Sequence, residues 1–245
     1  MKDLEQLRAY YQAVLPFYDD SLAGRGDLPF WEAAAREWGA TGILELGCGT
    51  GRVTEVLSRY ARVTAVDLLI ELLERASRKA PAARLAVADL RQFSFASRFG
   101  LIVLADDPMA HLIAAAERGK VLMLIAEHLV PGGRLVLEGL YRPFRMETVV
   151  PAREILRNGR APFTVEESWK PAGHSTWEAT YRYEEGSSVV EATSLLRSWT
   201  RSDADGLSEA GLRVDRLWGD FDRQPFLESS RRIVIVATKE EDPRL

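Results

Sequence analysis

Short apolar runs alternate with amphipathic stretches over the first 140 residues of the chain. The runs have the length of buried strands and span residues 42–46, 62–66, 83–88, 101–105 and 133–137. The stretches between them carry apolar residues at helical spacing and span residues 52–59, 69–79 and 114–129. This alternation predicts an α/β fold, with a mainly parallel sheet covered by helices on both faces.

The pattern changes after residue 140. Apolar and polar residues then alternate with a period of two over 163–169, 177–183 and 190–196, which predicts an antiparallel β insertion. An arginine-rich stretch before it, Arg145 to Arg160, is expected to be helical. A helix over 200–211 and strands over 213–218 and 231–238 follow. These two strands bring the large sheet to seven.

The sharpest local signal is the sequence Ile43-Leu-Glu-Leu-Gly-Cys-Gly-Thr-Gly-Arg52, where the first strand meets the first helix. Glycines at alternate positions allow a backbone to approach a ligand closely at the carboxyl end of a parallel strand. A dinucleotide-binding loop would have a glycine where Arg52 stands, and a phosphate-binding P-loop would continue with Gly-Lys-Ser or Gly-Lys-Thr. Neither spacing is present.

Four further segments extend this signal, and together they resemble the class I S-adenosylmethionine-dependent methyltransferases. Val63-Thr-Ala-Val-Asp67 ends the second strand in an acid, and Ala86-Val-Ala-Asp89-Leu90 ends the third in another. Phe99–Ala105 and Pro131–Glu138 match the fourth and fifth strands of that family. The resemblance implies a Rossmann-like seven-stranded sheet, S-adenosyl-L-methionine as cofactor and S-adenosyl-L-homocysteine as product.

The same resemblance implies which residues touch the cofactor. Asp67 would accept hydrogen bonds from the ribose hydroxyls and Asp89 from the adenine amino group, while the segment 18–31 would cover the cofactor. The implied cofactor-binding residues are Tyr18, Glu45, Gly47, Cys48, Gly49, Gly51, Asp67, Leu68, Asp89, Leu90 and Ala105.

The segment after the fourth strand is where the family's acceptor site begins. Asp107-Pro108-Met109 departs from the box of enzymes that methylate nucleic-acid amino groups, because it lacks the second proline and the aromatic residue. His111 is the candidate general base, since imidazole titrates near neutral pH. A histidine that only packs at the start of a helix is an equally open interpretation of His111.

Composition narrows the class of partner. The 245 residues carry a net charge of −4, which disfavours a dedicated nucleic-acid binder. One cysteine, Cys48, indicates a reducing compartment, and the charged N-terminus lacks the pattern of a secretory signal. We therefore expect a cytoplasmic protein without a membrane partner, and the three histidines lack the spacing of metal ligands.

The predicted organisation is a cofactor-binding core formed by residues 1–140 and 200–245, with residues 141–199 as an inserted cap or homodimerisation subdomain. The predicted activity is methyl transfer to N or O of a small-molecule acceptor. Two alternatives stay open at this point: a nucleic-acid or protein methyltransferase, and a non-catalytic cofactor-binding module.

Overall fold

The computed structural model describes residues 2–142 and 146–240. It divides into two compact units, one with residues 1–25 and 144–197 and the other with residues 26–143 and 198–245. We call them the four-stranded unit and the seven-stranded unit. The predicted division placed residues 1–25 with the large sheet, whereas here they group with the four-stranded sheet. No helix of the described ranges is long and apolar enough to cross a membrane.

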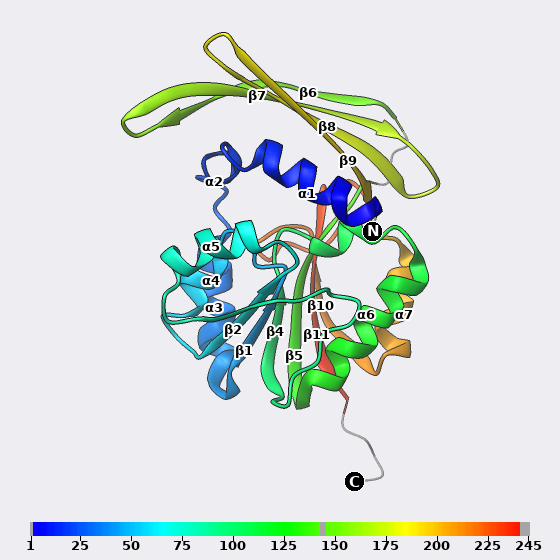
Figure 1. Cartoon of the computed structure of the whole chain (residues 1–245). Coiled ribbons are helices and arrows are strands. Elements are labelled where there is room, and N and C mark those ends of the chain that lie inside the picture. The colour runs from blue at the N-terminus through cyan, green and yellow to red at the C-terminus, as the bar shows by residue number, and fades with distance from the viewer. Residues whose placement is uncertain (1, 143–145, 241–245) are drawn as a thin grey trace. The chain divides into compact units, whose positions relative to one another are not determined.

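The seven-stranded unit contains the predicted mixed sheet (Figure 1). Its strands are β1 (Ile43–Leu46), β2 (Val63–Asp67), β3 (Arg84–Val87), β4 (Phe99–Leu104), β5 (Leu129–Leu140), β10 (Leu212–Trp218) and β11 (Arg232–Lys239). The strand order is β10-β11-β5-β4-β1-β2-β3, and β11 runs antiparallel to both of its neighbours. The parallel strands β1, β2 and β4 therefore direct their carboxyl ends to one edge of the sheet, which confirms the predicted fold class.

Helices cover both faces of this sheet (Figure 1). They are α3 (Leu28–Trp38), α4 (Arg52–Leu57) and α5 (Ile70–Lys79) on one face, and α6 (Ala115–His128) and α7 (Arg201–Glu209) on the other. Successive residues of β4 enter opposite cores, Leu101 under α3 and Ile102 under α6. Because both faces are buried, the strands appear in the sequence as continuous apolar runs. Burial of each leucine or isoleucine side chain stabilises the folded state by about 1.5–3 kcal/mol.

The four-stranded unit is an antiparallel meander with two helices. Its elements are α1 (Lys2–Val14), α2 (Tyr18–Ser21), β6 (Thr148–Arg157), β7 (Arg160–Pro171), β8 (Thr176–Glu185) and β9 (Ser188–Arg197). The three stretches of period-two alternation are confirmed as β7, β8 and β9. Phe17 stacks on Tyr183 with ring centroids 4.6 Å apart, so the N-terminal residues complete the core of this unit.

The helix predicted between Arg145 and Arg160 is wrong. Arg145 lies outside the described residues, and Thr148–Arg157 form β6, which pairs with β7. The physical reason lies in Asn158-Gly159, the two-residue turn between paired Arg157 and Arg160, in which Gly159 has φ of +69°. Asn-Gly is a strong hairpin signal, and β-branched Val149 and Val150 favour a strand over a helix.

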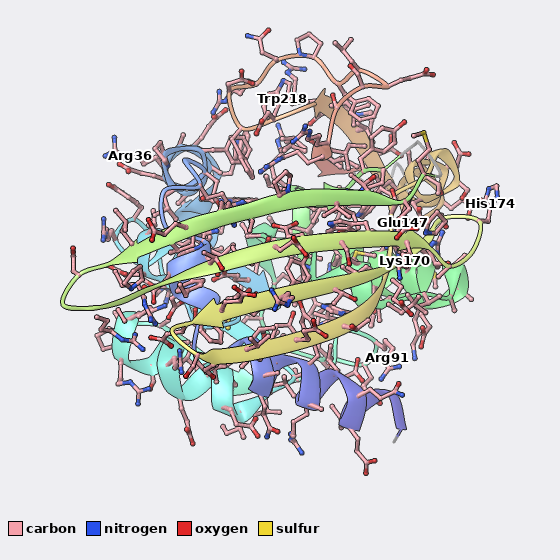
Figure 2. All side chains as sticks on the ribbon, turned by 90° about the horizontal axis from the view of Figure 1, so that it is seen from above. Arg36, Arg91, Glu147, Lys170, His174 and Trp218 are labelled. Carbon is pink, nitrogen blue, oxygen red and sulfur yellow. The ribbon has the colours of Figure 1, made fainter. Side chains whose placement is uncertain are left out.

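Figure 2 looks down on the four-stranded sheet, with Lys170 near the end of β7 and His174 in the turn that follows. His174 is exposed in that turn.

Candidate active site

The glycine loop follows β1 and bends sharply before α4. The backbone N–H groups of Gly47 and Cys48 both donate to the carbonyl of Val66, each at 2.9 Å. Gly47 has φ of +72°, and a Cβ atom there would lie 2.4 Å from Cβ of Pro108. Gly51 has φ of +82°, and its Cβ would lie 2.8 Å from Cα of Ala76. These two positions therefore require glycine both for backbone conformation and for space.

Asp67 links the end of β2 to this loop. Its carboxylate accepts hydrogen bonds from the N–H of Gly49 at 2.8 Å and from the N–H of Leu69 at 3.0 Å. Burial raises the pKa of Asp67, and the backbone hydrogen bonds from Leu69 and Gly49 oppose that rise. The next residue, Leu68, is half-buried. Asp67 thus lies at the carboxyl edge of the sheet beside the glycines, as the spacing predicted.

Glu45 is a second buried carboxyl group beneath the loop. Its Oε2 accepts a hydrogen bond from the hydroxyl of Thr54 at 2.6 Å. Burial raises the pKa of Glu45 to about 8, although the charge of Arg52 opposes the rise. A protonated carboxyl at neutral pH explains how two acidic groups can share one buried region.

Arg52 is held by an aspartate that the sequence reasoning missed. Its two terminal nitrogens each donate to one oxygen of Asp27, both at 2.7 Å. Asp27 is fully buried and also accepts from the indole N–H of Trp31 at 3.1 Å. This bidentate pair joins the first turn of α4 to the start of α3, so the role of Arg52 is structural.

Asp89 is the second residue after β3, and Arg91 forms an ion pair with it. The guanidinium of Arg91 donates to both carboxylate oxygens, with the shortest bond at 2.6 Å, and also pairs with Glu117 at 3.0 Å. Burial alone would raise the pKa of Asp89, but the hydrogen bonds and charge of Arg91 outweigh it and hold the pKa below its ordinary value. The side chain of the neighbouring Leu90 is half-buried against the core.

The turn after β4 carries the candidate base. Asp106 and Asp107 have φ of +59° and +44°, a strained conformation that costs non-glycine residues about 1–2 kcal/mol each. The 3₁₀ helix η2 (Pro108–His111) follows. Burial lowers the pKa of His111 to about 4, so its imidazole is neutral at physiological pH. Ala105, at the start of this turn, is buried in the same core as Cys48.

A buried arginine beneath the turn explains how the strain is held. Arg118 is 1% exposed and donates to the carbonyls of Met109 and Leu112, each at 3.1 Å. It also pairs with Asp203 at 3.4 Å, and its guanidinium lies 5.4 Å from the ring of Trp199. Sequence reasoning missed Arg118, although its place on the buried stripe of α6 with Val121, Leu122 and Ile125 was a usable signal.

Asp107 joins the same network from the other side. Its carboxylate accepts from the N–H of Leu140 at 2.6 Å and from the indole N–H of Trp199 at 3.4 Å. Burial raises the pKa of Asp107 to about 6 despite the nearby charge of Arg118. The turn is therefore anchored to β5 and to the segment before α7.

Most of the predicted cofactor residues meet at one edge of the seven-stranded sheet. Glu45, Gly47, Cys48, Gly49, Gly51, Asp67 and Ala105 come together there, and Asp89 and Leu90 follow β3 at the same edge. Tyr18 belongs to the four-stranded unit, where its ring contacts Tyr11 edge-on at 6.1 Å, so its contact with the cofactor stays a prediction. Within the described ranges, no group of three or more His, Cys, Asp or Glu is placed to hold a metal.

The residues at this edge fit a cationic cofactor. Two buried carboxyls, Glu45 and Asp67, lie by the glycine loop, and the nearby cation Arg52 is bound to Asp27. Burial raises the pKa of the Cys48 thiol, so this side chain is inert filler and not a nucleophile. The positive charge of a bound sulfonium or ammonium group would favour ionisation of these carboxyls.

Comparison with known proteins agrees with this geometry. Residues 43–133 match the methyltransferase domain family. The chain is 26% identical to a dTDP-3-amino-3,4,6-trideoxy-alpha-D-glucopyranose N,N-dimethyltransferase of Streptomyces venezuelae, over 74% of this chain and 78% of that protein. It is 25% identical to a dTDP-4-amino-2,3,4,6-tetradeoxy-D-glucose N,N-dimethyltransferase of Saccharopolyspora spinosa, over 74% of each chain.

A solved structure gives the same result. The S-adenosylmethionine-bound amino pentose methyltransferase CalS10 of Micromonospora echinaspora superposes with a TM-score of 0.73 and 25% identity, over 91% of this chain and 96% of that one. These matches identify the chain as an S-adenosylmethionine-dependent methyltransferase.

Proposed function

We propose that this enzyme methylates the amino nitrogen of a small molecule, and that the acceptor is an amino sugar carried on a nucleotide. The relatives from Streptomyces venezuelae and Saccharopolyspora spinosa are named for acceptors of this class. Within the chain, the observation that carries the proposal is the packing of Pro108 against Gly47, which brings the His111 turn to the glycine loop.

In this proposal the cofactor lies over Gly47–Gly51, with Asp67 at its ribose and Asp89 at its adenine. Leu68, Leu90 and Ala105 would border the adenosine, and Tyr18 would cover it. Arg91 would orient Asp89, because its guanidinium donates to both carboxylate oxygens. Glu45 would support the loop from beneath.

S-adenosylmethionine supplies a methyl group activated by its sulfonium, so the protein has mainly to align the acceptor amine with it. Such positioning lowers the activation free energy by about 7–11 kcal/mol in favourable cases. A C–N bond forms while the C–S bond breaks, and the ammonium formed later loses its proton. His111, neutral because burial lowers its pKa to about 4, can accept a hydrogen bond from the amine and orient its lone pair.

Orientation is the stronger role for His111. An imidazole with a pKa near 4 is too weak a base to deprotonate an ammonium ion efficiently, because the corresponding amine binds the proton far more tightly. Proton loss to water before binding, followed by alignment at His111, fits these properties better than proton abstraction.

The test has a binding arm and an acceptor arm. In calorimetry, wild-type protein should bind S-adenosylmethionine, Asp67→Asn should bind it at least about tenfold more weakly, and the exposed control Asp222→Asn should be unchanged. In the acceptor arm, dTDP-amino sugars should gain one or two methyl groups by mass spectrometry, and their hydroxyl analogues none.

Three outcomes would overturn the proposal. Methylation of the hydroxyl analogue in place of the amine would assign O-transfer, and methylation of tRNA or protein in place of amino sugars would favour the other acceptor classes. Cofactor binding without turnover on any of these acceptors would favour a non-catalytic module.

We further propose that the 141–199 insert forms a homodimer contact and that the enzyme acts in the cytoplasm. Exposed apolar side chains of the four-stranded sheet support the contact: Leu156 is 78% exposed, Val189 51% and Leu195 45%. Light scattering should give twice the monomer mass for the wild type and the monomer mass for Leu156→Glu/Leu195→Glu. A wild-type monomer would refute the contact, and cell fractionation tests the location.

A further inference from the structure

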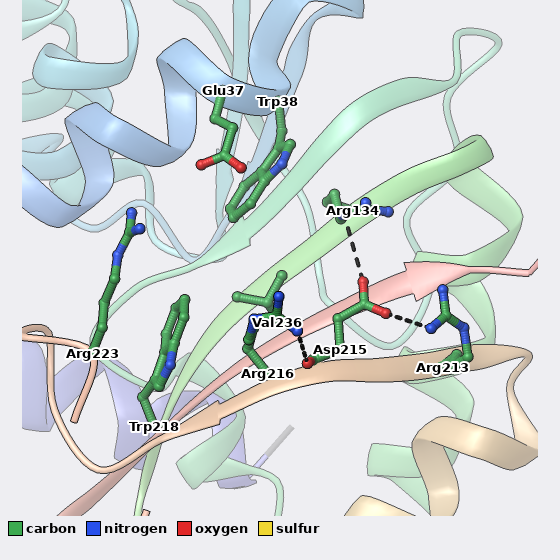
Figure 3. Close-up of a pocket in the computed structure, with 9 residues that line it drawn as sticks. All are labelled: Glu37, Trp38, Arg134, Arg213, Asp215, Arg216, Trp218, Arg223 and Val236. Atoms are coloured by element: carbon green, nitrogen blue, oxygen red, sulfur yellow. Dashed lines mark hydrogen bonds and ion pairs between the residues drawn. The ribbon is translucent and has the colours of Figure 1, made fainter. Parts of the chain in front are cut away.

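A cavity of about 410 Å³ opens at the β10–β11 side of the seven-stranded unit (Figure 3). It lies between the end of α3, which supplies Trp38, and the last residues of β10, which supply Trp218. Its volume is within the range of small-molecule sites. None of the residues assigned to the cofactor lines it. In the strand order β11, β5 and β4 separate β10 from β1, the strand that leads into the glycine loop.

The charge of the cavity is opposite to that of the whole chain. Four arginines line it against two acids, Glu37 and Asp215, whereas the protein as a whole has a net charge of −4. Asp215 is shared by Arg213 at 2.9 Å and Arg134 at 3.8 Å. The acids therefore leave a local excess of positive charge.

Arg216 and Arg223 carry that excess. Arg216 donates to the backbone carbonyl of Asp215 at 2.7 Å, and Arg223 lies over the rings of Trp218 and Phe30 at 5.3 and 5.9 Å. Among residues 2–142 and 146–240, neither forms an ion pair with a carboxylate. Both side chains are exposed, so their guanidinium forks are accessible to a phosphate or carboxylate.

The rest of the lining suits a flat ring. The indoles of Trp38 and Trp218 enter from different elements on different sides of the cavity, and buried Val236 lies on the strand between them (Figure 3). Both indoles are half-buried, which leaves ring surface for stacking. Guanidinium groups bind an anionic group, and a neighbouring indole can stack on an aromatic ring attached to it.

We infer that this cavity is a second binding site, for a small planar organic anion of the nucleoside monophosphate type. The ring stacks against Trp38 or Trp218, and the anionic group lies between the guanidinium groups of Arg216 and Arg223. The site is independent of the acceptor proposed above, since neither the glycine loop nor the His111 turn lines it.

The test uses the full chain saturated with S-adenosylhomocysteine, which keeps the probe out of the cofactor site. Adenosine monophosphate is titrated while tryptophan fluorescence and heat are recorded. Binding should be saturable, and Arg216→Gln and Arg223→Gln should each weaken it about tenfold, the effect of losing one charge-assisted hydrogen bond. Trp218→Leu should reduce the fluorescence change.

Three controls decide the result. Arg78→Gln, an exposed arginine on α5, should leave the affinity unchanged, and adenosine or inorganic phosphate alone should bind at least about tenfold more weakly than the monophosphate. Equal affinity in wild type and both cavity variants would overturn the inference, as would loss of all binding when S-adenosylhomocysteine is present. A cavity variant that changes the oligomeric state without changing affinity would identify a second copy of the chain as the occupant and also refute it.

Discussion

Pro108 lies so close to Gly47 that a Cβ atom on the glycine would be 2.4 Å from Cβ of the proline and 2.8 Å from its Cγ. The contact joins the glycine loop to the strained turn that carries His111. Because the two segments are in contact, a larger side chain at Gly47 would displace Pro108 and the turn that follows it. Substitutions at Gly47 and Pro108 can therefore be tested together.

Gly47→Ala should destabilise the protein by about 2–4 kcal/mol, since the left-handed backbone and the clash with Pro108 both contribute. Gly132 provides a matched control, because it has φ of +70° but nothing within 4 Å of its Cβ position. Gly132→Ala should cost only the backbone part, about 1–2 kcal/mol. Chemical denaturation measures both, and the added variant Pro108→Gly should recover part of the loss at Gly47 only. Equal losses at the two glycines would contradict the clash.

Arg118→Met should lower the free energy of unfolding by about 3–5 kcal/mol. The substitution leaves Asp203 buried without its cation and removes two hydrogen-bond donors to the His111 turn. Lys120→Met on the same helix is the control, since it removes an equal charge from an exposed position. Arg118→Lys keeps the charge without the fork and should fall between the two. A loss below about 1 kcal/mol for Arg118→Met would show that the turn holds its conformation unaided.

The buried Glu45 predicts a pH dependence of stability. Its pKa is raised to about 8 by burial, so the folded protein keeps a proton that the unfolded chain loses near pH 4.5. Unfolding then releases a proton, and stability should fall as pH rises towards 8. Asp107, with a pKa raised to about 6, acts in the same direction only at lower pH, and His111, with a pKa lowered to about 4, acts oppositely only below pH 6.5.

The window from pH 6.5 to 8 therefore isolates Glu45 among these three groups. Glu45→Gln should flatten the fall in unfolding free energy measured across it. A wild-type protein whose stability is constant or rises in this window would contradict a protonated Glu45. If the cofactor binds as proposed, its cationic groups favour ionised Glu45, and calorimetry in buffers of different ionisation enthalpy should detect proton release at pH 7.

The sequence predicted what depends on local pattern and missed what depends on distant partners. Apolar runs and helical spacing identified the seven-stranded sheet, and the spacing of Gly47, Asp67 and Asp89 predicted that they follow neighbouring strands at one edge of it. The pairing of Arg52 with Asp27 and the hydrogen bond from Trp199 to Asp107 join residues 25 and 92 positions apart, and no periodicity encodes them. Strand β6 is a different case, because a local signal was present. Asn158-Gly159 indicated a hairpin turn, but the arginine-rich stretch around it was interpreted as a helix.

His111 offers the sharpest test of how the enzyme treats its acceptor. If the imidazole only accepts a hydrogen bond from the amine, His111→Gln should keep kcat within about tenfold, since a side-chain amide oxygen also accepts. His111→Leu should lower kcat about a hundredfold, with KM for S-adenosylmethionine unchanged, because alignment and not cofactor binding is lost. Stopped assays with an amino sugar nucleotide measure both constants. Equal and large losses for Gln and Leu would instead require proton transfer to the imidazole, because glutamine accepts a hydrogen bond but cannot take up a proton.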